Sequence, residues 1–509
     1  MTDTGKRGLD ALNHEVAVAL TTLNYPGQPW PASLARASQQ ALETSKVIDV
    51  LIVGAGMCGQ TVAFALRREG IDRLRVIDQA SAGLEGPWAT YARMNTLRSP
   101  KHLTGPDLGI PSLSFRAWFS ALHGDEAWVS LYKINRLDWN RYLHWVRDRI
   151  GINVENDIEF KAVTPSAEHP ESILDVIIEH RADGRKELIR CRHLVLALGR
   201  DGSGSLRWPQ FKTWQVNDPA RRQSVWHAAD PIDFKLMRNQ RIAVLGAGAS
   251  AFDNAACALE AGAASVELHV RRPQLPQINK SKGSSYPGFQ RGFFRLPDAE
   301  RWWLMNYIFD EQVPPPHESI HRCERHEQFR ICLNHAWEDL RINRVQRQGG
   351  DKHQTGDRHQ EVQVLSNQGS HVFDQVVLAT GFDVDLMVRP DHENFAHAVQ
   401  RWRDHLDPLA VSEFPESARF PYLGAGFEFL PHPEAKGYDW VRRIHAFNWG
   451  CAISHGPLAG DIPGLRVGVE RLCQAIVSRL FNDDFESHKA ALMNFDDREL
   501  ESTRWFVDR

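Results

Sequence analysis

Two glycine-rich turns of one kind constrain this chain more than any other feature, and the first is Gly54-x-Gly56-x-x-Gly59. It follows the apolar run 49–53, which is typical of a buried parallel strand, and it precedes a predicted helix over 58–69. In such a unit the glycines permit a tight turn, close approach of the backbone to a diphosphate, and close packing of helix on strand. The turn therefore predicts a dinucleotide site, with the diphosphate at the helix N-terminus. A glycine turn in another kind of α/β protein is the alternative.

An acidic residue stands where the first site needs one. Asp78 ends the next predicted strand, and a carboxylate at this place binds the hydroxyls of a cofactor ribose. We expect Asp78 and the adjacent Gln79 to contact the nucleotide of the first site.

The second turn repeats the arrangement as Gly246-x-Gly248-x-x-Ala251. It lies between a predicted strand, 241–245, and a predicted helix, 249–261. The same reasoning predicts a second dinucleotide site here, with contacts from the backbone at three residues of the turn and helix start: Gly246, Gly248 and Ser250.

The second site lacks the acid. Val270 occupies the position that matches Asp78, and Arg271 and Arg272 follow it. A carboxylate would repel a ribose 2′-phosphate, whereas guanidinium groups bind it with charge-assisted hydrogen bonds. The arginine pair therefore favours NADPH over NADH, and a solvated surface pair is the alternative.

Two nucleotide sites in one chain indicate hydride transfer from NADPH to a tightly bound second cofactor, most simply FAD. The strand ends at 196–199 and 378–382 would mark the two crossings between the units. We therefore expect an α/β fold with two Rossmann-like dinucleotide-binding domains, the NADPH domain being inserted into a discontinuous FAD domain. The predicted boundaries are 1–45 for an N-terminal helical extension, 46–228 and 372–482 for the FAD domain, 229–371 for the NADPH domain, and 483–509 for a tail.

Composition limits the partners and the compartment. A formal net charge of −4 provides no basic surface for nucleic acid or anionic lipid, and no apolar run is long enough to span a membrane. The 7 cysteines form no C-x-x-C pair, which predicts reduced thiols in a cytoplasm and no metal site. These limits leave a small-molecule substrate as the expected partner, and self-association as a homo-oligomer stays open.

Further motifs carry a resemblance to a known family. "EGPW" at 85–88, with Trp88, resembles a Gly-Gly-x-Trp motif, and 374–382 matches D-x-x-x-x-A-T-G-[FY] through Thr380 and Gly381. "WHAADP" at 226–231, with His227, resembles a signature linker histidine. Over about 46–480 the chain resembles the flavin monooxygenases with two dinucleotide domains, which include flavin-containing monooxygenases, Baeyer–Villiger enzymes and N-hydroxylases. The Phe-x-Gly that precedes the histidine in Baeyer–Villiger enzymes is missing, which argues against that branch.

The resemblance also implies residues near the chemistry. Asn95 resembles the asparagine that hydrogen-bonds near the reactive flavin edge, and Lys101 would be the counterpart of a substrate-binding lysine in N-hydroxylases. "ISHG" at 453–456 resembles a Thr-His-Gly segment, which would place His455 and Gly456 close to flavin or substrate. The structural alternatives are a turn cap for Asn95, an exposed charged loop for Lys101, and interdomain packing for His227.

The implied activity is NADPH-driven reduction of FAD, addition of O₂ to give a flavin C4a-(hydro)peroxide, and oxygenation of a small polar substrate. N-hydroxylation or hydroxylation of an amine, an amino acid or an N-heterocycle would fit, as would a urate hydroxylase type of reaction. The alternative of another class is an NADPH-dependent flavin or disulfide reductase without oxygenation. Cys58 has no cysteine partner nearby in the sequence, which disfavours a dithiol relay.

Overall fold

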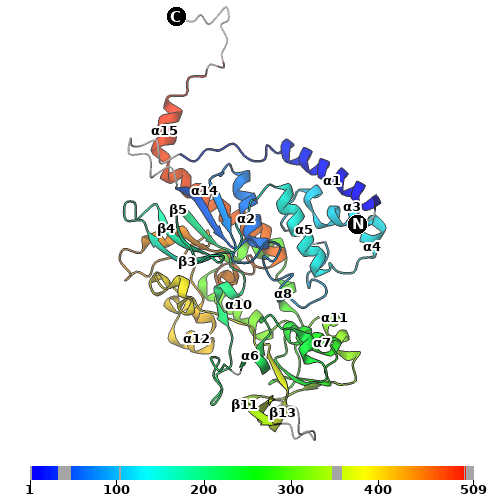
Figure 1. The fold of residues 1–509 in the computed structure, drawn as a ribbon. Coiled ribbons are helices and arrows are strands. Elements are labelled where there is room, and N and C mark those ends of the chain that lie inside the picture. Colours follow the sequence, from blue (N-terminus) through cyan, green and yellow to red (C-terminus); the bar gives the residue numbers. More distant parts are fainter. Residues whose placement is uncertain are drawn as a thin grey trace, which may run out of the picture.

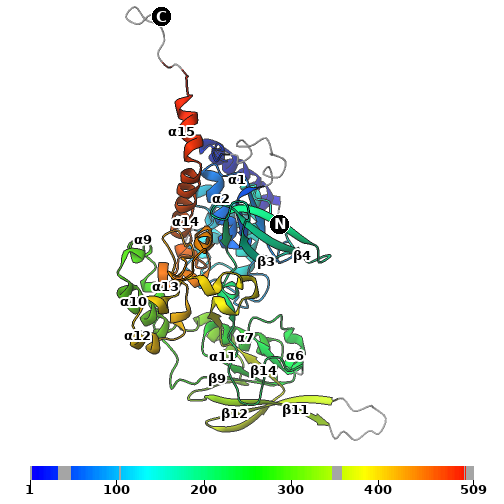
Figure 2. The ribbon, with the colours of Figure 1, turned by 90° about the vertical axis from the view of Figure 1, so that its left-hand side faces the viewer.

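Two α/β units make up the two halves of the molecule, as the two glycine turns predict (Figures 1 and 2). The computed structural model describes residues 3–32, 47–102, 105–219, 221–346, 358–497 and 499. Chain segments cross between the halves before and after the second unit, so the second unit is an insertion in the first.

The first sheet has the order β2-β1-β5-β4-β3, with β16 beside β5. Its central strand β1 is apolar throughout because it is covered on both faces, and Leu51 and Ile52 are completely buried. β1 pairs in parallel with β2 and β5, whereas β3, β4 and β5 form an antiparallel meander. The strands are β1 (Ile48–Val53), β2 (Leu74–Ile77), β3 (Ile158–Pro165), β4 (Leu174–His180), β5 (Lys186–Leu196) and β16 (Ile444–Ala446).

The second sheet is fully parallel, with the order β10-β9-β8-β14-β7. Its helix α7 (Ala249–Glu260) buries a run of alanines, which lets the helix lie close to the sheet. An antiparallel sheet of β11, β12 and β13 packs beside it. The strands are β7 (Val225–His227), β8 (Arg241–Leu245), β9 (Ser265–His269), β10 (Phe329–Cys332), β11 (Trp337–Gln346), β12 (Arg358–Ser366), β13 (Gly369–Phe373) and β14 (Gln375–Leu378).

The second sheet shifts two of the predicted domain boundaries. β7 and β14 hydrogen-bond within this sheet, so 225–227 and 375–378 lie with the NADPH unit and not with the FAD unit. The predicted limits at 229 and 371 therefore leave the edge strand β7 and the inner strand β14 outside the NADPH domain to which they belong. The apolar run at 375–378, which precedes Ala379-Thr380-Gly381, fits a buried strand of either sheet, and only the pairing distinguishes them.

Helices cover the first sheet. α2 (Met57–Arg68) packs against the long α14 (Ile462–Asp483), and α1 (Asp3–Thr22) lies on α3 (Phe115–His123) (Figure 1). The first half of the predicted N-terminal helical extension, 1–45, forms the helix α1, and residues 33–45 of it lie outside the described residues. The predicted tail begins with a helix, α15 (Phe485–Met493). The remaining helices of this part are α4 (Asp125–Ser130) and α5 (Arg136–Arg149).

A third cluster of helices was not predicted as a unit. α10 (Asp298–Glu311) packs on α13 (Ala452–His455), and Trp302, Trp402 and Ile453 share their apolar core. Figure 2 shows these helices grouped on one side of the molecule, with α9 and α12. The cluster therefore joins the segment 278–303 to the chain near 453–456. The other short elements are α6 (Arg221–Ser224), α8 (Lys280–Gly283), α9 (Pro287–Gly292), α11 (His317–Glu324), α12 (Pro408–Glu413), β6 (Gly204–Leu206) and β15 (Phe382–Val384).

No helix within the described ranges is both long enough and apolar enough to cross a lipid bilayer.

Candidate active site between the two dinucleotide folds

The first glycine turn has the geometry of a diphosphate cradle. Gly54 has φ +101°, and a Cβ added there would lie 2.4 Å from the Ala197 carbonyl oxygen. A Cβ at Gly59 would lie 1.7 Å from the Gly54 carbonyl oxygen, so helix and strand could not approach as they do. At Gly56 the added Cβ would touch only Gly86 Cα, at 3.6 Å. Gly56 is also the N-cap of α2 and no side chain caps it, which leaves the helix N–H groups open to an anion.

Asp78 anchors this turn. It is 7% exposed, and its carboxylate accepts hydrogen bonds from the backbone N–H groups of Ala55 and Ala80, both at 2.7 Å. Burial raises its pKa. Each carboxylate oxygen keeps a second lone pair, so Asp78 can still accept from a ribose hydroxyl. Gln79 is exposed, and its backbone carbonyl accepts from Arg181 at 2.9 Å.

Trp88 provides an independent sign of a bound group. Its indole N–H is buried and finds no hydrogen-bond partner among the described residues. Its ring lies 6.5 Å from that of Trp139 in an edge-to-face arrangement. A buried donor without a partner is costly, and a cofactor acceptor at this position would satisfy it. The residues of the first site therefore fit FAD.

The second turn repeats the cradle. Gly246 has φ +138°, and an added Cβ would lie 2.6 Å from the Ala379 carbonyl oxygen. Gly248 is the N-cap of α7, again without a side-chain cap, and a Cβ there would meet nothing within 4 Å. Ser250 is exposed in the first turn of the helix. This open helix N-terminus fits the diphosphate of NADPH.

The two arginines of the second site differ. Val270 is buried at the end of the strand, and Arg271 is exposed with no hydrogen bond to the described part of the chain. Arg272 donates to the Asp310 carbonyl at 3.3 Å and lies 3.6 Å from the Asp310 carboxylate. Arg271 is therefore the freer of the two for a 2′-phosphate.

His227, Thr380 and Gly381 lie close together where the neighbouring strands β7 and β14 end. His227 is 1% exposed, its Nε2 lies 3.1 Å from the Gly381 carbonyl oxygen, and its Nδ1 accepts from the Ala229 N–H at 3.1 Å. Burial lowers its pKa, so the ring is neutral. The Thr380 hydroxyl donates to the Arg207 carbonyl. Both ring nitrogens of His227 therefore have protein partners at the ends of the neighbouring strands β7 and β14, which leaves neither nitrogen free for the predicted catalytic role in this arrangement.

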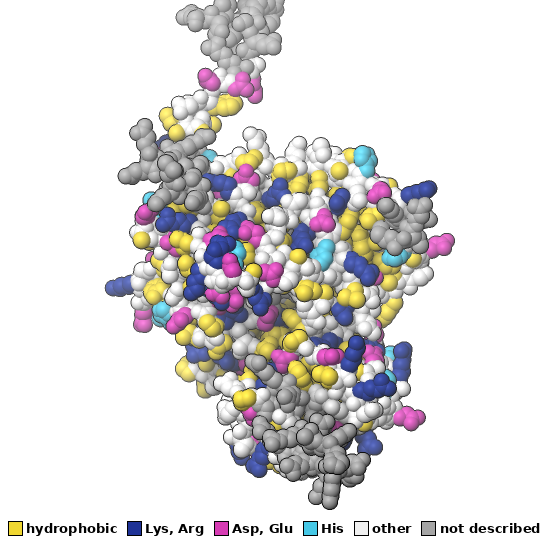
Figure 3. Space-filling view, viewed as in Figure 1, with side chains coloured by type: hydrophobic (Ala, Val, Ile, Leu, Met, Phe, Trp, Pro, Cys, Tyr) yellow, Lys and Arg dark blue, Asp and Glu magenta, His cyan; other side chains and the backbone are white. Residues whose placement is uncertain are grey.

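Asn95 lies at a cavity between the two halves. The cavity has a volume of about 480 Å³, and Figure 3 shows a recess between the halves on one face. Asn95 is exposed there, and its side-chain amide has no hydrogen bond to any described residue; only its backbone carbonyl accepts, from Arg136 at 3.0 Å. The amide does not cap its own turn and is free to donate. The lining residues are Thr90, Ala92, Arg93, Asn95, Arg136, Pro231, Ile232, Asp233, Phe234, Cys257, Glu260 and Arg322.

Lys101 is engaged elsewhere. Its ammonium donates to the carbonyl oxygens of Trp128 at 2.6 Å and Val129 at 3.1 Å, and it lies 4.8 Å from the Trp128 ring centroid. These carbonyls belong to the C-terminal end of α4, where a cation is favourable. The structure thus does not bring Lys101 and Asn95 to one cavity, and it gives Lys101 a capping role.

His455 is locked inside the protein. It is fully buried and its ring is sandwiched between Phe294 at 4.6 Å and Phe427 at 3.9 Å. Its Nδ1 accepts from Arg471 at 3.0 Å and its Nε2 donates to the Gly424 carbonyl at 2.9 Å. Burial and the adjacent guanidinium lower its pKa well below the usual range. His455 therefore holds the turn at Gly456, which has φ +75°, and offers no free ring nitrogen.

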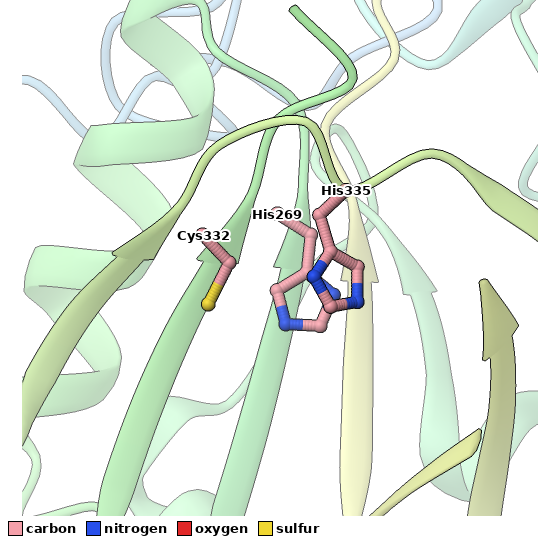
Figure 4. A group of neighbouring side chains, drawn as sticks. All are labelled: His269, Cys332 and His335. Atoms are coloured by element: carbon pink, nitrogen blue, oxygen red, sulfur yellow. The ribbon is translucent and has the colours of Figure 1, made fainter. Parts of the chain in front are cut away.

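A group of three side chains in the second half has the composition of a metal site. His269, Cys332 and His335 bring ligand atoms within 4.8 Å of one another (Figure 4). However, the Nδ1 of His269 accepts from Trp337 at 2.7 Å and its Nε2 lies 3.1 Å from a Glu267 carboxylate oxygen. Both nitrogens of His269 are occupied, so a metal would have to displace a hydrogen bond, and we assign none here.

Sequence reasoning missed Arg93, which lines the cavity beside Asn95 and donates to the carbonyl oxygens of Ala228 and Asp230, both at 2.6 Å. Its partners lie 135 and 137 residues further along the chain, so no local pattern indicated this contact.

Comparison with known proteins agrees with this geometry. A family model described as L-lysine 6-monooxygenase/L-ornithine 5-monooxygenase matches residues 128–384, and an FAD-NAD(P)-binding model matches 51–201. An FAD-dependent urate hydroxylase of Xanthomonas campestris pv. campestris is 35% identical over 495 residues, which is 97% of both chains. The chain belongs to the L-lysine 6-monooxygenase/L-ornithine 5-monooxygenase family.

Solved structures confirm the fold of the monooxygenase. The reduced ornithine hydroxylase of Pseudomonas aeruginosa has a TM-score of 0.63 at 18% identity, covering 85% of this chain and 100% of that one. The ornithine N-hydroxylase of Kutzneria sp. 744, solved with reduced FAD, NADP⁺ and L-ornithine, has a TM-score of 0.62 at 14% identity, covering 85% and 99%. The family models and the 35% identical relative confirm the predicted family, enzyme class and FAD and NADPH cofactors, and the solved structures confirm the fold class.

Proposed function

We propose that this monooxygenase uses NADPH and O₂ to oxygenate a small polar substrate that contains nitrogen. The observation that carries the proposal is the presence of two open helix N-termini, at Gly56 and Gly248, in two facing dinucleotide folds. Held at the N-terminus of α2 and near Trp88, FAD would supply the hydride acceptor for NADPH and the centre at which O₂ is activated. The protein binds both cofactors, orients them, and keeps water away from the reacting centre.

The residues of the chain divide these tasks. The N-termini of α2 and α7 bind the two diphosphates, and Arg271 binds the 2′-phosphate. The free amide of Asn95 donates a hydrogen bond at the cavity between the halves. Trp88 donates its indole N–H to the flavin nucleotide. In this assignment His227, Lys101 and His455 are positioning residues, since their polar atoms already have protein partners.

Two substrate types have support. The family model suggests N-hydroxylation of an amine or amino acid, whereas the relative that aligns over 97% of both chains is named for hydroxylation of urate, an N-heterocycle. The engagement of Lys101 at the end of α4 weakens the parallel with the amino acid hydroxylases. We therefore test both types.

The competing reductase function has little support from the cysteines. The Cys58 thiol accepts from the Gly460 N–H at 3.3 Å, and burial raises its pKa to about 11. A protonated thiol is a poor nucleophile at neutral pH, so a dithiol relay through Cys58 is disfavoured. All seven cysteines are free, which fits our proposal of a cytoplasmic enzyme.

A panel of urate, L-ornithine and L-lysine tests the function. For each compound, NADPH consumption, O₂ consumption, H₂O₂ release and product are measured with FAD-loaded enzyme. We expect one compound to raise NADPH oxidation and lower the fraction of O₂ released as H₂O₂. If the flavin is reduced by NADPH but H₂O₂ accounts for all the O₂ with every compound, the proposed oxygenation of these substrate types is wrong.

A further inference from the structure

Part of the second unit leaves its own sheet and packs on the first half. β9 and β10 are neighbouring parallel strands of the second sheet, yet the chain between them, residues 270–328, contains α8, α9, α10 and α11. α9 contacts α14 and α10 contacts α13, and both of these partners belong to the chain that follows β16 of the first sheet. Figure 2 shows α9, α10 and α13 together on one side of the molecule. We call residues 270–328 the crossover segment.

The chain after β16 borders the first cradle. β16 runs parallel to β5, and β5 runs parallel to β1, so residues 447–461 leave the sheet at the same edge as the turn at Gly54. In open α/β sheets ligands bind at this edge, beyond the carboxyl ends of the strands. Near the end of this stretch the Gly460 N–H donates to the sulfur of Cys58 at 3.3 Å, in the first turn of α2. Residues 447–461, the cradle-side segment, therefore lie beside the site that fits FAD.

The cradle-side segment cannot hold this place by itself. Its one α-helix, α13, has only 4 residues, and so short a helix is not stable alone. Gly456 and Gly460 both have positive φ, at +75° and +84°, and glycine is the residue with the greatest backbone freedom. The position of the segment therefore depends on its contacts with other parts of the chain.

Arg301 of the crossover segment provides a buried contact of this kind. It lies on α10 and is 5% exposed. Its Nη1 donates to the Ser454 carbonyl oxygen at 3.0 Å, and its Nη2 donates to the Asp298 carboxylate. The guanidinium carbon lies 5.0 Å from the centroid of the Trp402 ring. A buried guanidinium that is held by an acid of its own helix has a fixed position, so Arg301 fixes the backbone at Ser454.

Phe294 and Gln290 hold the same stretch of chain at two more points. The Phe294 ring stacks on His455 at 4.6 Å, with an angle of 9° between the ring planes, and Phe427 covers the other face of the imidazole. The Gln290 side-chain amide donates to the Pro463 carbonyl oxygen at 2.9 Å, in the first turn of α14. The crossover segment thus contacts this chain both before and after the point at which it meets α2.

We propose that Arg301 and Phe294 are positioning residues for FAD, and that the NADPH unit thereby completes the FAD site. Neither side chain needs to touch the cofactor. They fix the cradle-side segment, whose Gly460 N–H meets the first turn of α2, the helix proposed to bind the FAD diphosphate. Without these contacts the segment is free to move away from the cradle, and the FAD site loses one of its borders. This role does not depend on which substrate is oxygenated.

The test uses the full-length FAD-loaded enzyme and the variants Arg301→Gln, Arg301→Lys and Phe294→Leu. Trp303→Leu is the matched control, because Trp303 lies on the same helix, α10, but is 61% exposed and stacks on Tyr307. Each holoenzyme is diluted in steps, and the fluorescence of the released FAD gives the Kd for FAD. The visible spectrum of the bound flavin at saturating FAD, and Tm with and without added FAD, are measured in parallel.

We expect Arg301→Gln and Phe294→Leu to raise the Kd for FAD at least ~10-fold and to shift the visible spectrum of the bound flavin. Arg301→Lys should recover part of the affinity, because an ammonium group can still donate to the Ser454 carbonyl. Added FAD should raise Tm less in the two variants than in the wild type, since weaker binding stabilises the folded state less. Trp303→Leu should match the wild type in all three measurements. Phe294→Leu removes no buried charge, so it carries the test if Arg301→Gln does not fold.

Two results would overturn the inference. If the variants that fold keep the wild-type Kd for FAD and the wild-type flavin spectrum, Arg301 and Phe294 only stabilise the fold. If Trp303→Leu weakens FAD binding as much as they do, the effect does not come from the contacts with the cradle-side segment.

Discussion

The guanidinium of Arg93 donates to the carbonyl oxygen of Ala228 at 2.6 Å, which binds the loop after the first cradle to the chain entering the second unit. Arg93 also donates to the Asp230 carbonyl at 2.6 Å, and Arg322 on α11 donates to the Arg93 carbonyl at 3.1 Å. These hydrogen bonds at the edge of the cavity hold the two dinucleotide folds to each other, together with the bond from Thr96 to Glu318. Hydride transfer needs that orientation, since the reacting atoms must meet within about 3–3.5 Å.

Replacing Arg93 should therefore separate cofactor binding from cofactor communication. We expect Arg93→Ala to retain FAD and to slow flavin reduction by NADPH at least ~10-fold, because the two hydrogen bonds that the Arg93 side chain makes between the halves are lost. Anaerobic stopped-flow absorbance measures the rate. Arg116→Ala on α3, an exposed arginine far from this interface, is the control. An unchanged rate of flavin reduction in Arg93→Ala would show that the hydrogen bonds of Arg93 are not needed for hydride transfer.

The glycines of the first cradle should behave differently from one another. Gly59→Ala puts a methyl group 1.7 Å from the Gly54 carbonyl and should destabilise the fold by at least ~3 kcal/mol. Gly56→Ala meets only an ordinary contact at 3.6 Å, so the protein should fold and lose FAD affinity. Thermal unfolding and FAD content after purification distinguish the two. If the Gly56→Ala protein keeps its FAD, the FAD diphosphate does not bind at Gly56.

The two arginines of the second cradle should contribute unequally to NADPH binding. Arg271→Gln should raise the KM for NADPH roughly 10- to 100-fold and leave that for NADH unchanged, whereas Arg272→Gln should act more weakly because Arg272 already contacts Asp310. Steady-state kinetics with both nucleotides measures this. Arg238→Gln lies before β8, at the opposite end of the strand from the cradle, and should behave as wild type. Equal effects on both coenzymes would exclude 2′-phosphate recognition.

Buried neutral histidines should make stability depend on pH. Burial lowers the pKa of His445 to about 4, below an unfolded value of about 6.5. The contribution of neutral His445 to the free energy of unfolding is complete above pH 6.5. It is lost as the pH falls toward 4, by up to about 3 kcal/mol. We expect Tm to fall over this range and His445→Asn to flatten the slope. His14 on α1 is exposed, so His14→Gln should leave the pH dependence of Tm unchanged. If His445→Asn also leaves it unchanged, His445 is not the group responsible.

The cofactor folds were predictable from sequence because strand, turn and helix are local in the chain. Gly54, Gly59 and Gly246 are needed for contacts that the spacing itself encodes. The contacts of His227 and Lys101 could not be predicted, since their partners are the carbonyls of Gly381, 154 residues away, and of Trp128, 27 residues away. Arg93 escaped for the same reason, because its partners Ala228 and Asp230 lie 135 and 137 residues further along the chain. Distant segments meet there, and no periodic pattern indicates such a meeting.

The most direct test of the central claim is isotope transfer from ¹⁸O₂. FAD-loaded enzyme is supplied with NADPH, ¹⁸O₂ and, in separate reactions, urate, L-ornithine or L-lysine, and the first organic product is trapped and analysed by mass spectrometry. We predict one ¹⁸O atom in that product for each NADPH consumed, less the fraction released as H₂O₂. Oxidation of NADPH with all of the ¹⁸O recovered in H₂O₂, for urate and for the amines alike, would contradict the account.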